Sequence, residues 1–363
     1  MAKLGPGRVT KRGPRFATRA KPAAAHRSAA VAPSNAARPL LAWYRRYRRD
    51  LPWRESGDPY RVWVSEIMLQ QTQVERVREY FTRFMERFPD VAALAAAPER
   101  DVLKAWEGLG YYRRARQLHA AAKAVVAEWG GAFPRTAAEL RTLPGIGRYT
   151  AGAIASIAFG QPEPILEANS RRVFARLVGH AEPVGGAGDE PLWEVAAEFV
   201  PRRNAGLFNQ AVMDLGAMVC TVTQPRCENC PLAGACVARA TGRVEEIPVL
   251  PRQRAVRQIR ETALVLERGS RVVVERRQAG EWWEGLWDFP RAVKGEARAR
   301  GDRLLGTVVY SVTHHRITCR VVARTLGETG SAGPRRRLVT TAALARLAMT
   351  APGRRIADLL ARG

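Results

Sequence analysis

The chain has few acidic residues, few cysteines and no long apolar run. Of its 363 residues only 34 are Asp or Glu, against 59 Lys or Arg. No apolar stretch approaches the roughly eighteen residues that cross a bilayer, and the N-terminus shows no signal-peptide core. These absences argue against a membrane-spanning or secreted protein. We therefore expect a soluble, intracellular protein with no membrane partner.

The shortage of acidic residues leaves a formal net charge of +25. A charge of this size favours a polyanionic partner, and nucleic acid is the natural candidate. The alternative is a solvated basic surface in an Arg-rich protein. Residues 1–38 contain no acidic residue and many Lys and Arg, which predicts a disordered basic tail that serves as an electrostatic arm or as a transit peptide.

The chain has five cysteines, and four of them lie within one short segment. The spacing C-x6-C-x2-C-x5-C gathers four thiolates in one loop, as a tetrahedral zinc ion or a cubane iron–sulfur cluster requires. Such crowding argues against a disulfide framework. The spacing alone leaves the two metals open. The candidate ligands are Cys220, Cys227, Cys230 and Cys236.

A glycine turn lies between two helical runs at Leu143–Gly147, and a helix of small residues is expected over Thr150–Ala158. Gly145 and Gly147 allow a sharp bend and a close approach to another molecule. Amide N–H groups at such a turn, next to a helix N-terminus, can hold a phosphate oxygen. The pattern is typical of a helix-hairpin-helix, although a plain loop is the alternative.

Two further segments carry polar residues in apolar surroundings. Glu66 lies within the apolar stretch 59–72, where burial would raise the pKa of its carboxyl and make it a proton donor near neutral pH. The alternative is a carboxylate that caps a helix beside Ser65. Tyr111 follows a glycine turn and precedes three arginines, which suits base stacking or, alternatively, a helix cap.

The last third of the chain changes character after a Pro-containing linker at 241–258. Strands are expected at 262–266 and 271–275, joined by Gly269–Ser270, and again at 307–312 and 317–323. Helices fit 341–348 and 354–361. Residues 259–363 therefore form an α+β domain.

Several segments together resemble the adenine DNA glycosylases of the MutY type, within the endonuclease III superfamily. They are LPWR at 51–54, PYRVWVSEIMLQQTQV at 59–74, WEGLGYYRRARQLH at 106–119, LPGIGRYTAGAI at 143–154, FNQAVMDLGAMVC at 208–220, and the cysteine loop at 220–236. The resemblance implies a mainly α-helical, two-lobed catalytic region over 39–240 with a helix-hairpin-helix and an iron–sulfur loop. It also implies a Nudix-like lesion-recognition domain over 259–363, carried by residues 284–290.

In that family the enzyme removes adenine mispaired with 8-oxoguanine or guanine in double-stranded DNA. The resemblance implies that Glu66 protonates the adenine, that Glu167 stabilises the oxocarbenium-like sugar, and that Tyr149 and Asn169 support Glu167 and the water. It also implies a [4Fe–4S] cluster on the four cysteines and a monomeric protein, cytoplasmic and nucleoid-associated in a bacterium and nuclear or mitochondrial in a eukaryote. The resemblance also implies which residues bind substrate or DNA. Arg54 and Gln210 line the adenine pocket, Gln71 and Tyr111 fill the DNA helix where the base has left, Gly145 and Gly147 hold the DNA backbone, and Thr313 and His314 read the oxoguanine.

The sequence departs from the family at three places. Glu167 stands where the family has Asp, which predicts retained but slower base excision. Tyr149 stands where the lyase members of the superfamily carry lysine, which predicts a monofunctional enzyme. Val312 and Thr313 replace a Phe and a Ser, which puts part of the oxoguanine readout in doubt. Two alternative functions stay open: excision of another base, such as thymine from G:T, and a lesion-binding protein that lost turnover through Glu167.

Overall fold

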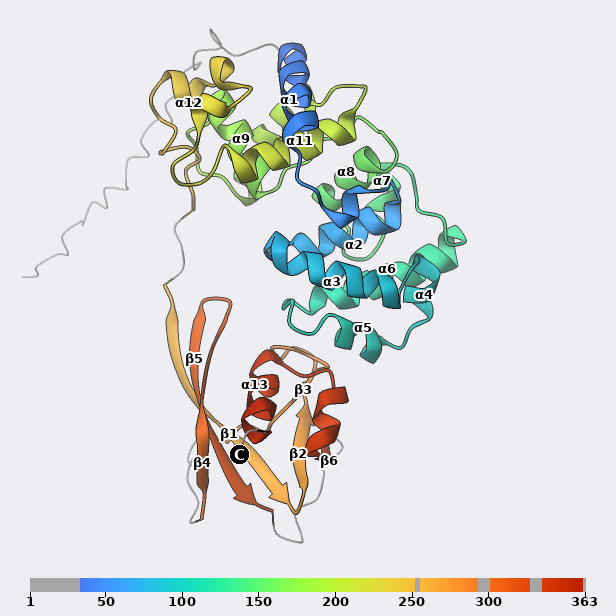
Figure 1. The fold of residues 1–363 in the computed structure, drawn as a ribbon, viewed down its shortest axis with the longest axis vertical. Helices are drawn as coiled ribbons and strands as arrows, with labels where there is room; N and C mark the ends of the chain where they lie inside the picture. The colour runs from blue at the N-terminus through green and yellow to red at the C-terminus, as the bar shows by residue number, and fades with distance from the viewer. Residues whose placement is uncertain (1–32, 252–254, 293–300, 327–334, 362–363) are drawn as a thin grey trace, which may run out of the picture.

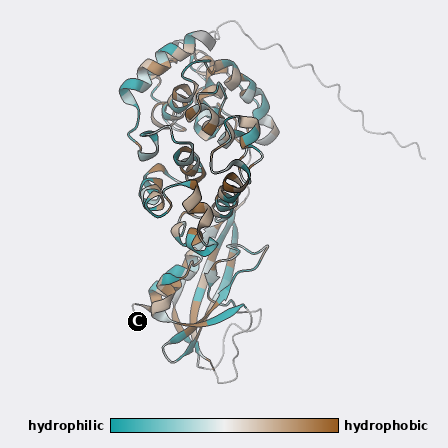
Figure 2. Cartoon of the chain, turned by 90° about the vertical axis from the view of Figure 1, so that its right-hand side faces the viewer, coloured by the Kyte–Doolittle hydropathy of each residue, from teal (hydrophilic) through white to brown (hydrophobic). Residues whose placement is uncertain are grey.

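The computed structural model describes residues 33–251, 255–292, 301–326 and 335–361. Most of the expected basic tail, residues 1–32, lies outside the described residues. The described chain forms a helical region of two lobes and a C-terminal domain built on a sheet (Figure 1). Hydropathy colouring shows apolar stretches alternating with polar ones along the helices, as amphipathic packing requires (Figure 2). No helix among the described residues is long and apolar enough to cross a membrane.

The first lobe surrounds one apolar cluster, in which Trp63, Phe81 and Leu118 are almost fully buried. Its apolar residues recur at three- and four-residue spacing, so each helix buries one face. The elements are η1 (Pro52–Arg54), α2 (Pro59–Leu69), α3 (Val74–Arg87), α4 (Val91–Ala96), α5 (Glu99–Ala105), α6 (Arg113–Trp129), α7 (Ala137–Leu140) and α8 (Arg148–Ile157).

The second lobe has a separate core that joins the first described helix to helices much later in the chain. Residues 33–38 were expected in the disordered tail, but α1 begins at Pro33, because Ala36 and Leu40 are buried in this core. The elements are α1 (Pro33–Tyr47), α9 (Ala168–Val178), η2 (Gly186–Asp189), α10 (Glu190–Phe199), α11 (Ala205–Met218), η3 (Cys227–Asn229), η4 (Ala233–Ala235) and α12 (Val237–Ala240).

The C-terminal domain is a mixed sheet whose strands run in the order β3-β2-β1-β5-β4, with β6 paired to β2. The expected hairpin at Gly269–Ser270 is confirmed, since Arg268 pairs with Arg271. The segment expected as a helix over 341–348 is a 3-10 helix that ends at Arg346. The Leu344 carbonyl accepts from the Leu347 amide, three residues on, at 3.2 Å and also from the Arg354 side chain at 2.9 Å. The elements are β1 (Arg257–Arg268), β2 (Arg271–Arg276), β3 (Trp287–Asp288), β4 (Arg303–Val312), β5 (His315–Thr325), β6 (Arg336–Thr340), η5 (Thr341–Arg346) and α13 (Ala351–Leu360).

The C-terminal domain is attached to the first lobe by an ion pair and an apolar contact. The Arg354 guanidinium donates to both carboxylate oxygens of Glu107, with Nε–Oε1 at 2.6 Å and Nη2–Oε2 at 3.2 Å. Leu286 and Ala348 join the buried cluster of the first lobe. The domain therefore docks beside the turn that precedes Tyr111.

Candidate active site

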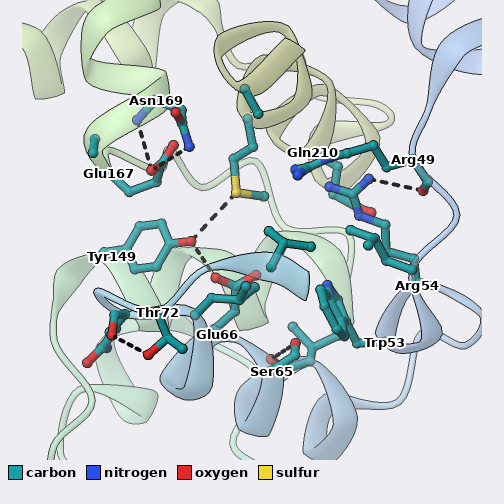
Figure 3. A pocket seen from close by; sticks show the side chains of 18 of the residues that line it. Arg49, Trp53, Arg54, Ser65, Glu66, Thr72, Tyr149, Glu167, Asn169 and Gln210 are labelled. Carbon is teal, nitrogen blue, oxygen red and sulfur yellow. Dashed lines mark hydrogen bonds between the residues drawn. The ribbon is translucent and has the colours of Figure 1, made fainter. Parts of the chain in front are cut away.

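A cavity of about 690 Å³ lies between the two helical lobes. Side chains of α2 and α8 line it from the first lobe, and side chains of α9 and α11 line it from the second (Figure 3). Seven of the residues named from the sequence line this cavity: Arg54, Glu66, Gln71, Tyr149, Glu167, Asn169 and Gln210.

Glu66 lies in the middle of α2 and is 4 % exposed. Burial raises the pKa of its carboxyl to about 7; the hydrogen bond donated by the Tyr149 hydroxyl lowers it in part, and the charge of Glu167 raises it. The cap of α2 is Asp58, which accepts from the Tyr60 amide. The alternative in which Glu66 caps a helix is therefore wrong, and its carboxyl can hold a proton near neutral pH.

Glu167 occupies the opposite wall at the N-cap of α9. Its Oε1 accepts from the amide of Ser170 at 2.8 Å, and its Oε2 accepts from the amide of Asn169 at 2.8 Å and from the Asn169 side chain at 3.3 Å. Burial raises the pKa of this carboxyl, and the two amides oppose the rise. The contacts fix both oxygens at the positive end of a helix dipole.

Tyr149 lies between the two carboxyl groups in Figure 3. It is the second residue of α8, directly after the glycine turn. Its hydroxyl donates to Glu66 and lies 3.6 Å from the Met213 sulfur. Burial, and then the charge of Glu66, raises the pKa of Tyr149 well above its ordinary value, so the hydroxyl keeps its proton.

The far end of the cavity contains an ion pair that sequence reasoning missed. Asp214 is fully buried and accepts from Arg54 at 2.7 and 3.0 Å and from Arg49 at 2.7 Å. Burial raises the pKa of Asp214, but its bonds to Arg54 and the charge of Arg49 outweigh this and hold it below the usual value. A signal was present, since Asp214 follows Gln210 by four residues on one helix face.

Gln210 lies next to this ion pair, and its Oε1 accepts from the Tyr44 hydroxyl at 3.1 Å. With its oxygen engaged, Gln210 keeps its amide nitrogen as a donor. The far end of the cavity therefore offers an amide donor beside two arginines held by one buried carboxylate, which suits a flat heterocycle with hydrogen-bond acceptors on its edge.

A second hollow, of about 600 Å³, adjoins the cavity at Gln71 and includes Tyr111 and the glycine turn. Tyr111 is 55 % exposed. Gly145 has a φ of +75°, and a Cβ there would lie 2.6 Å from Gln117. Gly147 has an ordinary φ of −89°, so its own backbone does not require glycine; it caps α8 without a side-chain bond and leaves the first amides of that helix open.

Thr313 and His314 lie elsewhere, at the turn between β4 and β5 in the C-terminal domain. They line neither hollow. The turn points toward the helical region in Figure 1. Thr313 is exposed and has a φ of +52°, and its Oγ1 lies 3.3 Å from the His315 Nδ1.

The four clustered cysteines follow α11 and surround η3 and η4. All four are free thiols, and Arg176 donates to the Cys220 sulfur at 3.3 Å. Within the described ranges no three His, Cys, Asp or Glu side chains converge closely enough to hold a single metal ion. Four thiols in one loop, with a guanidinium beside one of them, nevertheless fit a thiolate-bound cluster by the chemistry of the donors.

Comparison with known families gives two matches along the chain. A model described as HhH-GPD superfamily base excision DNA repair protein matches residues 64–194, and a NUDIX domain model matches residues 262–359. A solved structure entitled a thermostable thymine-DNA glycosylase is 29 % identical, with a TM-score of 0.52, and covers 58 % of this chain and 97 % of that one. The two-lobed helical fold and the Nudix-like domain expected from the sequence are thereby confirmed.

Three relatives carry the same name. The adenine DNA glycosylase of Buchnera aphidicola subsp. Baizongia pistaciae is 35 % identical, and the match covers 70 % of this chain and 73 % of that protein. Those of Rattus norvegicus and Homo sapiens are 46 % and 47 % identical, over 59 % and 58 % of this chain. The chain spans 44 % and 40 % of these two longer proteins. The chain therefore belongs to the adenine DNA glycosylase family.

Proposed function

We propose that this protein is a monofunctional DNA glycosylase that hydrolyses the N-glycosidic bond of adenine mispaired with 8-oxoguanine or guanine in double-stranded DNA. The observation that carries the proposal is the pair of carboxyl groups across one cavity, with the pKa of Glu66 near 7 and Glu167 fixed by backbone amides. The shared name of the relatives supports adenine as the base.

The proposed reaction follows from the two carboxyl groups on opposite walls of the cavity. An adenine extruded from the duplex enters the cavity, where its edge meets Gln210 and its N7 meets the protonated Glu66. Proton transfer from Glu66 to N7 makes adenine a better leaving group, and the C1′–N9 bond breaks with its electron pair on the base. The cationic sugar is stabilised by Glu167, and a water then adds to C1′ and gives its proton to the Glu66 carboxylate, which restores the acid.

The second hollow binds the DNA around the extruded base. The amides that follow Gly145 and Gly147 suit a phosphate oxygen of the backbone. Gln71 and Tyr111 fill the space that the extruded base leaves. Thr313 and His314, at the tip of the β4–β5 hairpin, read the oxoguanine on the other strand.

The four cysteines Cys220, Cys227, Cys230 and Cys236 hold a [4Fe–4S] cluster in this proposal. The cluster is redox-active when bound and takes no part in the proton transfers above. The chain's own contribution is to place the thiols directly after α11, the helix that carries Gln210 and Asp214. Loss of the cluster is therefore expected to loosen the far end of the cavity.

The absence of an amine at Tyr149 supports a monofunctional reaction, since a Schiff base needs a primary amine. The described residues that line the cavity include no lysine. Borohydride treatment during turnover should give no abundant covalent adduct with DNA. A strong adduct would contradict this part of the proposal.

A glycosylase assay on a panel of duplexes tests the function. We expect release of free adenine from oxoguanine:adenine and guanine:adenine duplexes and none from matched DNA. The likeness to the thymine-DNA glycosylase structure favours one second candidate. Release of thymine from G:T without release of adenine would support that candidate, and tight lesion-dependent binding without any free base would indicate a binding protein.

A further inference from the structure

Two turns contribute exposed side chains to the second hollow: the first turn, residues 70–72, carries Gln71, and the second turn, residues 106–111, carries Tyr111. Both side chains stand on residues with an unfavourable, left-handed backbone conformation. Gln71 has a φ of +57° and Tyr111 a φ of +47°, although neither is glycine. A left-handed conformation costs a non-glycine residue on the order of 1 kcal/mol or more. Such a conformation persists only where the surroundings hold it, so each turn needs a support.

One buried side chain supports both turns. Arg114, the second residue of α6, is 8 % exposed. Its Nη1 donates to three carbonyls at the end of α2 and in the first turn, those of Ile67, Met68 and Gln70, at 2.9, 3.0 and 2.5 Å. Its Nη2 donates to the second turn, at the carbonyls of Leu109 and Gly110, both at 3.1 Å, and to Thr72 Oγ1 at 3.3 Å.

The partners of Arg114 are backbone oxygens, the Thr72 hydroxyl and aromatic rings rather than acids. Among the described residues no carboxylate lies within ion-pair distance of its guanidinium. The group lies 5.4 Å from the Trp106 ring and 5.6 Å from the Tyr111 ring. Burial lowers the pKa of Arg114 to about 10, so the side chain remains a cation at neutral pH. A buried cation without an acid partner is costly, which argues for a role beyond packing.

We propose that Arg114 is a positioning residue that locks the turns of Gln71 and Tyr111 together, so that the two side chains enter the duplex as one rigid wedge. The inference rests on the proposed function, in which the wedge fills the gap left by the extruded adenine. The planar fork of arginine reaches both turns at once, because its two terminal nitrogens point in different directions. A lysine places a single nitrogen there and cannot reach all six of the oxygens that the two terminal nitrogens of Arg114 contact.

The test compares Arg114→Lys with the intact protein. With adenine as substrate, we expect the single-turnover excision rate to fall by about 10- to 100-fold, the scale on which small misplacements act. With 2-aminopurine in place of the adenine, we expect a matching loss of the fluorescence rise that reports base extrusion. The apparent pKa of the rate should stay near 7, because Glu66 is untouched. A shift of that pKa, or unchanged extrusion, would overturn the proposal.

A double-mutant cycle separates positioning from a general loss of stability. In a Gln71→Ala, Tyr111→Ala background the wedge is gone, so Arg114→Lys should change the remaining rate by less than about twofold. Full additivity would contradict the proposal. The matched control is Val125→Ala, about three turns further along the same helix and buried in the same core. It should lower stability and leave base extrusion unchanged.

Amide hydrogen exchange tests the same idea without any need for turnover. The Thr72 amide donates to the Leu69 carbonyl and the Leu109 amide to the Trp106 carbonyl, one in each turn. Arg114→Lys should speed exchange at both amides, whereas an effect on one turn or on neither would overturn the proposal. If the intact protein releases no adenine, the proposed function fails, and exchange still decides the role of Arg114.

Discussion

The two walls of the central cavity present the same functional group in opposite surroundings. Glu66 lies in the middle of α2, where the helix has already used its backbone amides, and among the described residues only the Tyr149 hydroxyl donates to it. Glu167 lies at the start of α9, where two backbone amides donate to it. Position along a helix thus decides which carboxyl lacks backbone donors and which has them.

This difference assigns the roles. A desolvated carboxyl without backbone donors keeps its proton near pH 7 and can act as an acid, whereas an amide-bound carboxylate holds a fixed place for a developing positive charge. Burial raises the pKa of both groups, so the amides, rather than exposure, distinguish them.

Removal of the proton on Glu66 should have the largest effect. Glu66→Gln keeps the size of the side chain and can still accept from Tyr149, but it cannot protonate adenine. We expect the single-turnover rate to fall by about 10³-fold, within the usual range for a general acid. The control is Glu75→Gln, whose side chain is 85 % exposed on α3 and should leave the rate unchanged. A loss of less than tenfold would remove Glu66 as the acid.

Neutralisation of Glu167 should have a smaller effect. Glu167→Gln retains an oxygen that can cap α9 but loses the negative charge opposite the sugar. A reduction of about 10²-fold is expected, typical of the loss of one preorganised electrostatic contact. Glu182→Gln, in an exposed loop, serves as the control. An equal loss in Glu66→Gln and Glu167→Gln, with the same pH dependence, would show that the two walls are not distinct.

The same contrast should appear in stability. The pKa of Glu66 rises from 4.5 to about 7 on folding, so its ionisation opposes folding, and stability is lost as the pH rises from 4.5 through 7. Glu66→Gln does not show this loss. Its free energy of unfolding should match that of the intact protein at about pH 4 and exceed it at about pH 8.5 by up to about 3 kcal/mol. Denaturant titrations at the two pH values measure the difference, and a gap at the lower pH alone would contradict the account.

The smallest effect is expected from Glu167→Asp. The substitution shortens the side chain by one methylene and introduces the aspartate that the resemblance to the family implies at this place. Since aspartate is also a good helix cap, α9 should keep its start. We expect a several-fold faster single-turnover rate, consistent with the sensitivity of reacting groups to small displacements. Indistinguishable rates would refute the idea that Glu167 carries a penalty.

Local sequence patterns predicted the helix after the glycine turn, observed as α8, and the β1–β2 hairpin, because a run of small residues after a glycine turn and a Gly-Ser turn are local signals. They failed at Pro33–Arg38, where contact with helices more than a hundred residues later extends α1. They also failed at 341–348, where the Leu344 carbonyl accepts from the Leu347 amide, three residues on, and from the Arg354 side chain, so the segment is a 3-10 helix.

The functional site was likewise predicted only in part from the sequence. The resemblance named Glu66 and Glu167, and the buried stretch around Glu66 suggested its raised pKa from the sequence alone. Neither the resemblance nor the local sequence pattern suggested Asp214 as the partner of Arg54, and neither suggested Arg114 as the link between the two turns. Both roles depend on contacts across more than forty residues, and such contacts leave no periodic signal in a single sequence.

The pH dependence of single-turnover excision, measured on an oxoguanine:adenine duplex from pH 5 to 9, tests the central claim most directly. The account predicts a rate that is level at low pH and falls about tenfold per pH unit above an apparent pKa near 7, with this decline absent in Glu66→Gln. A rate that rises through pH 7, or one that declines identically in Glu66→Gln, would contradict the assignment of Glu66 as the acid.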